Sequence, residues 1–415
     1  MSSTIHHSQP KALGHIRVLD LSRVLAGPWC SQNLADLGAD IIKIERPGSG
    51  DDTRAWGPPY AKDATGADTS EAAYYLAANR GKRSVTCDIA SSEGQALVRE
   101  LAAHADVVLE NFKVGHLARY GLDYASLKAI KPDLVYCSVT GFGQDGPYAH
   151  RAGYDFLIQG MGGFMSITGE RDDLPGGGPQ KAGVAIVDLM TGMYATVAIL
   201  AALTHRDRSG EGQHIDMALL DVQVAMLANM ASNYHTTGVA PKRFGNAHAN
   251  IVPYQSFACL DGHIIVATGN DSQYVKFVEA GGCPELAHDE RFASNPQRVK
   301  HRATLVPLLA AMVAQYGRDD WIARLEAVGV PCGPINDIDD VFENEQVRAR
   351  GIAVELPHPT AGKVKLVRNP MKLSATPVGA GTAPPLLGQH TDEVLREVLG
   401  RSAEQIAALR GRGVV

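Results

Sequence analysis

Asp188 is the residue of this sequence whose setting most needs a chemical explanation. It is the single carboxylate between Asp173 and Asp207, and aliphatic residues flank it on both sides. Burying a carboxylate costs free energy unless the group is paired or hydrogen-bonded. Two explanations stay open: Asp188 caps the N-terminus of a helix, or it is a nucleophile held near a cleft. Gly192, about one helical turn later, would let a ligand or a backbone segment approach closely.

Two glycine-containing segments follow predicted strands. Residues 23–29 (RVLAGPW) come directly after the first strand, where open α/β sheets bind ligands, but they lack the glycines of a dinucleotide fingerprint. Glu45 stands where a nicotinamide enzyme would place its ribose-binding acid, yet Arg46 and a proline follow at once. Residues 141–146 do match GxGxxG, but Pro147 follows instead of an apolar helix. The sequence therefore disfavours a nicotinamide enzyme and predicts a ligand-contacting loop at 141–146.

Cationic and amide side chains recur just after successive predicted strands. Each alone is typical of a solvated surface, but together they would lie on one edge of the sheet and could hold a phosphorylated ligand. The set is Arg46, Asn79, Arg80, Lys82, Arg83, Asn111, Lys113 and Arg119.

Several other function classes are disfavoured. The formal charge of −6 offers no basic surplus for nucleic acid. The histidines show no HExxH spacing, no GxSxG is present, and the six cysteines form no CxxC pair, so we expect neither a metal site nor a serine hydrolase. The scattered cysteines fit a reducing compartment, and the first ten residues lack the features of a targeting peptide. We therefore expect a cytoplasmic protein.

The elements that must position these residues alternate between strand and helix. Short β-branched runs at 15–22, 39–45, 83–89, 106–112 and 133–139 are separated by helical patterns, which predicts a doubly wound α/β fold with a parallel sheet. The apolar stretch 182–204 approaches the length of a membrane span, but Asp188, Thr191 and Gly192 interrupt it. We expect a buried helix there and no membrane association.

The length of 415 residues favours two domains. We predict a flexible N-terminal arm at 1–12 and a large domain formed by 13–222 together with 340–415. A smaller α+β domain, with its linkers, is predicted at 223–339.

Several of these segments together resemble one known family. The run VLDLSRVLAGPWCSQNLADLGADIIKIERPGSGDDTR, followed by AANRGKRSVTCDI, DVVLENF, SVTGFGQDGPY, RAGYDF, VDLMTGMYA, GEGQHIDMALLD and LGQHTDEVL, is similar to family III CoA-transferases over most of the chain. The resemblance implies a Rossmann-like large domain, an interlocked homodimer, acyl-CoA and a carboxylic acid as substrates, and no permanently bound cofactor. It also implies that Asp188 is the catalytic nucleophile. The CoA contacts implied by it are Val24, Leu25, Ala26, Arg46, Asn79, Asn111, Phe112, Lys113, Arg119, Thr140, Gly141, Phe142 and Gly143.

The resemblance leaves alternatives to CoA transfer. Related α-methylacyl-CoA racemases carry a histidine where this chain has Tyr154, and a neutral tyrosine is a poor base near pH 7. A non-catalytic CoA-binding protein is a third interpretation, which the retained Asp188 motif argues against. Formyl-CoA transferases carry a glycine-rich loop where residues 243–250 contain one glycine. We therefore expect a dicarboxylate or carnitine-like acid as substrate, with Arg243 and His248 as hypotheses for recognising a carboxylate.

Overall fold

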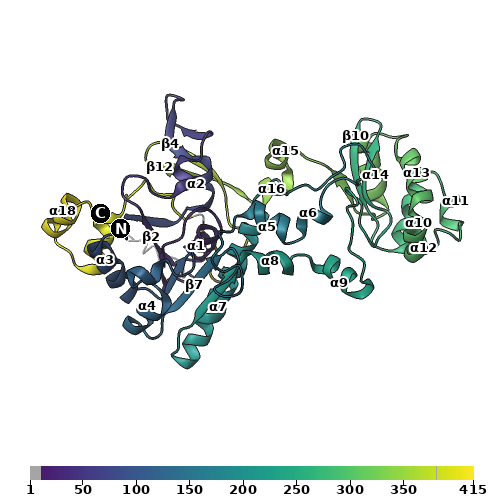
Figure 1. The fold of residues 1–415 in the computed structure, drawn as a ribbon. Helices are drawn as coiled ribbons and strands as arrows, with labels where there is room; N and C mark the ends of the chain where they lie inside the picture. Colours follow the sequence, from purple (N-terminus) through teal and green to yellow (C-terminus); the bar gives the residue numbers. More distant parts are fainter. Residues whose placement is uncertain (1–10, 380) are drawn as a thin grey trace. The chain divides into compact units, whose positions relative to one another are not determined.

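The computed structural model describes residues 11–379 and 381–415 (Figure 1). It divides into two compact units. The first comprises Met1–Gly163, Ala182–Ala228 and Gln346–Val415, and the second comprises Phe164–Lys181 and Asn229–Glu345. The sequence-based division placed 164–181 in the large domain. The structure groups this segment with the smaller unit, because the Gly245 N–H donates to the Gly169 carbonyl at 3.2 Å and Arg243 pairs with Asp172.

A six-stranded parallel sheet forms the centre of the first unit. Its strands are β1 (Arg17–Asp20), β2 (Asp40–Glu45), β5 (Lys82–Thr86), β6 (Val107–Glu110), β7 (Val135–Thr140) and β8 (His214–Ala218). The spatial order is β5-β2-β1-β6-β7-β8. Counted within the sheet, this is the order 3-2-1-4-5-6, in which the direction of winding reverses between β1 and β6. The predicted α/β class with a parallel sheet is confirmed.

Helices cover both faces of this sheet, because its strands are apolar on both sides (Figure 1). Successive residues point to opposite faces: Leu19 packs with α3 (Ser92–Ala103) and α4 (Tyr124–Ile130), whereas Val18 packs with α1 (Ala26–Asp36) and α7 (Ile186–Ser209). The helices and short helical turns of this unit are α1 (Ala26–Asp36), η1 (Asp52–Ala55), α2 (Ala73–Ala78), α3 (Ser92–Ala103), η2 (Leu117–Tyr120), α4 (Tyr124–Ile130), α5 (Asp155–Met161), α7 (Ile186–Ser209), α8 (Leu219–Ala225), α17 (Thr391–Leu399) and α18 (Ala403–Gly411).

Helix α7 is long and apolar enough to cross a membrane by length and composition, a test that core helices of water-soluble proteins also pass. Val187, Ala195 and Ile199 are fully buried in the cluster that joins α7 to α1 and the sheet. Val197 on the same helix is 60% exposed, so the expectation of a buried helix holds for one face of α7 only.

Two antiparallel hairpins lie outside the main sheet and were not predicted. They are β3 (Tyr60–Lys62) with β4 (Asp68–Ala72), and β12 (Ala353–His358) with β13 (Gly362–Val367). The first hairpin consists largely of polar and small residues, so the hydrophobic alternation that marks a strand is weak in it. The second hairpin does alternate, with Leu356 and Val364 buried on one face, and the sequence-based division overlooked this signal.

The second unit has its own core around Phe277 and Trp321. Its three-stranded sheet has the order β11-β10-β9. Its elements are α6 (Phe164–Ile167), α9 (Ala228–Thr237), β9 (Tyr254–Cys259), β10 (Gly262–Ala267), α10 (Asp271–Ala280), α11 (Glu285–His288), α12 (Asn295–Lys300), α13 (Arg302–Val313), α14 (Arg318–Ala327), β11 (Cys332–Pro334) and α15 (Ile338–Glu343), with α16 (Glu345–Ala349) at the boundary between units.

Candidate active site

A cavity of about 790 Å³ opens where the sheet reverses its winding. Its walls come from the segments that follow β1, β6 and β7, with Asp188 from α7 and Leu219 from α8. The carboxyl ends of strands at a switch point are the usual ligand site of open α/β sheets. Eight of the predicted CoA contacts line it: Val24, Leu25, Ala26, Asn111, Phe112, Lys113, Thr140 and Gly141.

The segment after β1 is held in an unusual backbone conformation. Val24 has φ of 71°, a region that a β-branched residue rarely adopts. Its N–H donates to the two carboxylate oxygens of Asp51 at 3.2 and 3.3 Å. Asp51 in turn forms an ion pair of 2.9 Å with Lys43, and both side chains are fully buried. The Lys43–Asp51 ion pair therefore fixes the loop after β1, which carries Val24, Leu25 and Ala26 to the cavity.

Asn111 joins the two loops that diverge at the switch point. Its side-chain oxygen accepts the Arg23 N–H at 3.0 Å, and its side-chain amide donates to the Arg23 carbonyl at 2.7 Å. The segments after β1 and after β6 are thereby fixed to each other across 88 residues of sequence. Asn111 shapes the cavity as well as lining it.

Asp188 lies in the first turn of α7 and is not its cap. The exposed N–H groups at this helix end are satisfied by another acid, Asp155, which accepts the N–H of Val187 at 2.8 Å and of Asp188 at 3.3 Å. Gln159 donates to the second oxygen of Asp155 at 2.6 Å. The capping explanation for Asp188 is therefore wrong, and Asp188 lines the cavity.

Burial raises the pKa of Asp188 to about 7, and the negative charge of Asp155 adds to the effect. A carboxyl group desolvated beside a like charge is typical of a functional site. Burial also raises the pKa of Tyr74, with the charges of Asp188 and Asp155 as further causes, which places the phenol near these two carboxylates. Trp56 lines the cavity and packs edge-on against Tyr74 with ring centroids 5.1 Å apart.

Two glycines allow the segments that line the cavity to approach each other closely. A side chain at Gly192 would stand 2.7 Å from the Ala26 carbonyl and 3.0 Å from Cβ of Trp29, so this glycine lets α1 approach α7. Of the two uses expected for Gly192, close approach of backbone is the one observed. Gly141 and Gly153 cross in the same way, since a Cβ on Gly141 would lie 2.5 Å from Cα of Gly153. That crossing ties the segment 151–154 to the end of β7.

The remaining predicted contacts lie elsewhere. Arg46 lines a second cavity of about 400 Å³, which shares Arg23, Asp52, Phe112 and His116 with the first. Asn79 is fully buried, where its side chain donates to the Tyr75 carbonyl and accepts from Lys82. Asn79, Arg119, Phe142 and Gly143 are outside the lining of both cavities. Their contacts with CoA stay predictions.

The cationic set is divided by its ion pairs. Arg80 is buried against Asp36, Lys82 is buried near Asp20, and Arg83 pairs with Asp40. These three side chains are engaged by carboxylates of the chain. The expectation that the whole set could hold a phosphorylated ligand is therefore too broad, because the cavities draw from it only Arg46, Asn111 and Lys113.

Arg243, a hypothesis for carboxylate recognition, pairs with Asp172 and donates to the carbonyls of Glu170 and Ser166 at 3.3 Å each. Its guanidinium is thus occupied within the second unit. His248 accepts the Asn250 N–H at 3.0 Å in the same unit. Neither observation favours the hypothesis.

Sequence reasoning missed Asp155, Trp56, Tyr74 and Arg151 as residues of the site. Arg151, Tyr154 and Asp155 lie in the segment RAGYDF, whose sequence signal is one alanine and one glycine beside charged and aromatic residues. Trp56 and Tyr74 flank the β3–β4 hairpin and carry no local signal beyond being aromatic.

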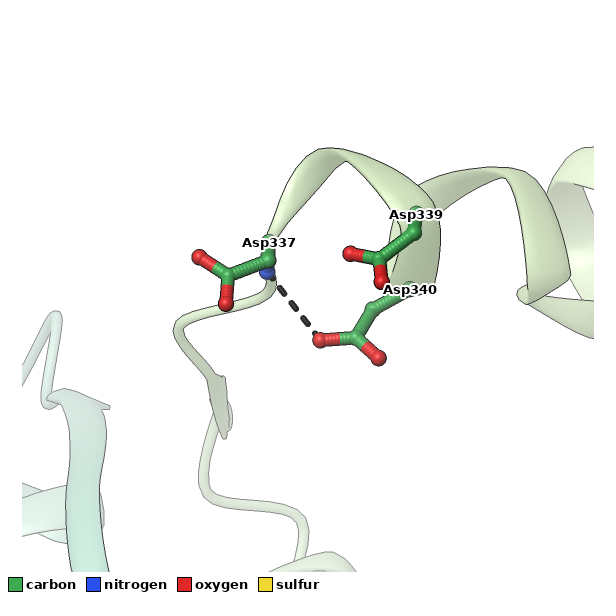
Figure 2. A group of neighbouring side chains, drawn as sticks. All are labelled: Asp337, Asp339 and Asp340. Atoms are coloured by element: carbon green, nitrogen blue, oxygen red, sulfur yellow. Dashed lines mark hydrogen bonds between the residues drawn. The ribbon is translucent and has the colours of Figure 1, made fainter.

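Asp337, Asp339 and Asp340 form a group of exposed carboxylates close enough to hold a metal ion (Figure 2). The arrangement has a structural explanation: Asp337 and Asp340 form the capping box of α15, in which the Asp337 N–H donates to Asp340 at 3.1 Å. Helix capping accounts for this geometry, and exposed acidic groups of this kind are common without an ion.

The sequence profile described as CoA-transferase family III matches residues 13–391. The chain belongs to this family, and it is a CoA-transferase.

Characterised relatives match nearly the whole chain. It is 52% identical over 386 residues to the succinate–glutarate CoA-transferase of Agrobacterium fabrum, covering 93% of this chain and 95% of that protein. It is 43% identical over 405 residues to the succinyl-CoA:glutarate CoA-transferase of Mus musculus, covering 98% and 90%. A crystal structure of a CaiB/BaiF family protein from Brucella suis is 51% identical, with a TM-score of 0.82 over 94% of this chain and 100% of that one.

Proposed function

We propose that this enzyme moves CoA from succinyl-CoA to a dicarboxylic acid such as glutarate, through a covalent intermediate on Asp188. The observation that carries the proposal is the half-buried carboxylate of Asp188 at the switch-point cavity, among eight residues expected to contact CoA. The names of the relatives from Agrobacterium fabrum and Mus musculus support the choice of substrates.

The proposed reaction consists of four acyl transfers. The Asp188 carboxylate attacks the thioester carbonyl, the C–S bond breaks, and CoA leaves as thiolate from a mixed anhydride. The thiolate then attacks the carbonyl of Asp188, which releases the donor acid and leaves an aspartyl-CoA thioester. The acceptor carboxylate displaces the thiolate to form a second anhydride. Attack of the thiolate on the acceptor carbonyl finally gives the new acyl-CoA and the free Asp188. Electrons and protons balance within these steps.

The site also suits this chemistry electrostatically. A pKa of about 7 makes Asp188 a stronger nucleophile than an ordinary carboxylate once it is ionised. We propose that the Rossmann-like large domain binds CoA along the two connected cavities, with Arg46 and Lys113 as cations for its phosphates.

Mass spectrometry of the intact protein tests the covalent step. The enzyme is incubated with succinyl-CoA, trapped with hydroxylamine or borohydride, and mapped by peptide, beside Asp188→Asn and the control Asp207→Asn, an exposed acid near the other end of α7. We expect a modification on Asp188 in the wild type and in the control, and none in Asp188→Asn. Unmodified protein with a panel of acyl-CoAs, together with α-proton exchange into deuterated water, would support the racemase interpretation instead.

We further propose an interlocked homodimer. Phe156 on α5 and Val197 on α7 are 59% and 60% exposed in the single chain, and such apolar surface is typical of an interface. Light scattering after size exclusion should give twice the chain mass of 44.2 kDa, and a monomer would contradict the proposal.

For the cellular location we propose the cytoplasm, supported by six free cysteines.

A further inference from the structure

The cavity that contains Asp188 also contains three strong cations: Arg23, Lys113 and Arg151. Arg23 pairs with Asp52 at 2.9 Å. Within residues 11–379 and 381–415, no carboxylate forms an ion pair with Arg151 or Lys113. The site thus presents two cations whose charge is available to a ligand.

Aromatic rings hold the Arg151 side chain in place. Its guanidinium lies 5.1 Å from the centroid of Phe142 and 4.6 Å from that of Tyr148, and one of its nitrogens lies 4.0 Å from the sulfur of Met161. Stacking on ring faces engages the plane of a guanidinium and leaves its N–H edge able to donate. The crossing of Gly141 and Gly153 anchors the segment that carries Arg151 to the end of β7.

The two free cations differ in what they bind best. Lys113 is a point charge on a flexible stem, in the segment after β6 that is expected to contact CoA, and a point charge suits a phosphate. The planar fork of Arg151 can donate two parallel N–H bonds to a carboxylate. A dicarboxylic substrate brings a second negative charge into a cavity that already contains the Asp188 carboxylate, so a cation is needed to offset the repulsion.

We propose that Arg151 binds the distal carboxylate of the dicarboxylic substrate while its other carboxyl group reacts at Asp188. This inference rests on the proposed function and names the residue that makes the enzyme select dicarboxylates over monocarboxylic acids. A site that donates hydrogen bonds to one substrate group discriminates against an analogue lacking that group.

The test compares acceptors that differ in one carboxylate. CoA transfer from succinyl-CoA to glutarate and to pentanoate is measured for the wild type, Arg151→Gln, Arg151→Lys and the control Arg208→Gln, an exposed cation in the last turn of α7. Loss of a charge-assisted pair should lower kcat/KM for glutarate by roughly 10–100-fold in Arg151→Gln. The value for pentanoate should stay within about twofold. Arg151→Lys should restore part of the loss, and Arg208→Gln should match the wild type.

Inhibition by free CoA separates this role from phosphate binding. We expect its inhibition constant to be unchanged in Arg151→Gln, because CoA has no distal carboxylate. Weaker inhibition by CoA, or an equal fall for both acceptors, would overturn the inference in favour of a phosphate contact or of packing against Phe142 and Tyr148. Where pentanoate is not turned over, its inhibition constant against glutarate replaces kcat/KM in the comparison. A wild type that transfers no CoA to glutarate would instead refute the proposed function.

Discussion

Asp155 caps the helix that carries Asp188: its carboxylate accepts the Asp188 N–H at 3.3 Å and the Val187 N–H at 2.8 Å. One acid therefore positions the backbone of another, and its charge also helps to keep the pKa of Asp188 high. Asp155 therefore both positions the first turn of α7 and raises the pKa of Asp188.

The activity should depend on pH through Asp188. In the proposed reaction Asp188 reacts as the carboxylate, and its pKa is about 7, so we expect kcat/KM to fall about tenfold per pH unit below that value. Asp155→Asn removes the like charge beside Asp188, which lowers the pKa of Asp188. The acid limb of the pH profile, where kcat/KM falls with decreasing pH, should therefore move to lower pH. The limb should remain above 3.8, since burial is the larger cause and persists. The pH profile of kcat/KM for both proteins checks this, with Asp207→Asn as control. An unmoved limb in Asp155→Asn would contradict a role for its charge.

The Asp188 carboxylate should lower the stability of the folded protein at neutral and alkaline pH. The folded protein raises the pKa of Asp188 above the ordinary 3.8, so the folded state binds the proton more tightly and stability falls as pH rises from about 4 to about 7. Asp188→Asn should therefore melt at higher temperature than the wild type at pH 8, by at most about 2–4 °C for each kcal/mol relieved. At pH 4 the two melting temperatures should nearly coincide. Scanning fluorimetry at both pH values measures this, and a gain of equal size at pH 4 would point to packing instead of charge.

The Lys43–Asp51 pair should be necessary for the loop at Val24. Both side chains are fully buried, and removing one charge of such a pair costs about 3–5 kcal/mol. We expect Asp51→Asn to be strongly destabilised and to raise the KM for succinyl-CoA. The exposed pair of Arg23 with Asp52 supplies the comparison, because Arg23→Ala should change stability by less than about 1 kcal/mol. Urea unfolding compares the two variants.

Lowering the pH should remove the stabilisation that the Lys43–Asp51 pair provides. Burial alone would raise the pKa of Asp51, but the charge and hydrogen bond of Lys43, together with the hydrogen bonds from Thr53, outweigh it and lower the pKa to about 2. The stabilisation is present above the ordinary value of 3.8 and is lost as pH falls toward about 2. Asp51→Asn should therefore lose less stability than the wild type between pH 4 and pH 2. A parallel loss in both proteins would show that other carboxylates dominate.

Gly192 should be required for the contact between α1 and α7. Alanine in a helix interior is normally more favourable than glycine by about 1 kcal/mol. At Gly192 the added Cβ would meet the Ala26 carbonyl at 2.7 Å, so Gly192→Ala should destabilise, by roughly 1–3 kcal/mol, and impair catalysis. A side chain at Gly183, just before α7, meets no atom within 4 Å, so Gly183→Ala is the control for adding a methyl group without a clash. Melting temperature and kcat/KM are measured on both, and a stabilised Gly192→Ala would refute the close approach.

The sequence by itself predicted the strands of the main sheet and singled out Asp188 as the candidate nucleophile. Alternating β-branched runs and helical patterns predicted β1, β2, β5, β6 and β7 in nearly their observed ranges, because the spacing of apolar residues along a strand or helix is a local property of the sequence. Asp188 stood out since an isolated acid in an apolar stretch is costly in any fold.

Only the tertiary structure decided which polar residues face the cavity. Arg80 and Lys113 look alike in sequence, yet Arg80 is buried against Asp36, 44 residues away, whereas Lys113 lines the site. The capping of α7 likewise depends on Asp155, 33 residues from Asp188. The direction in which a charged side chain points is set by its partner, and partners distant in the sequence meet only when the sheet and its helices are assembled.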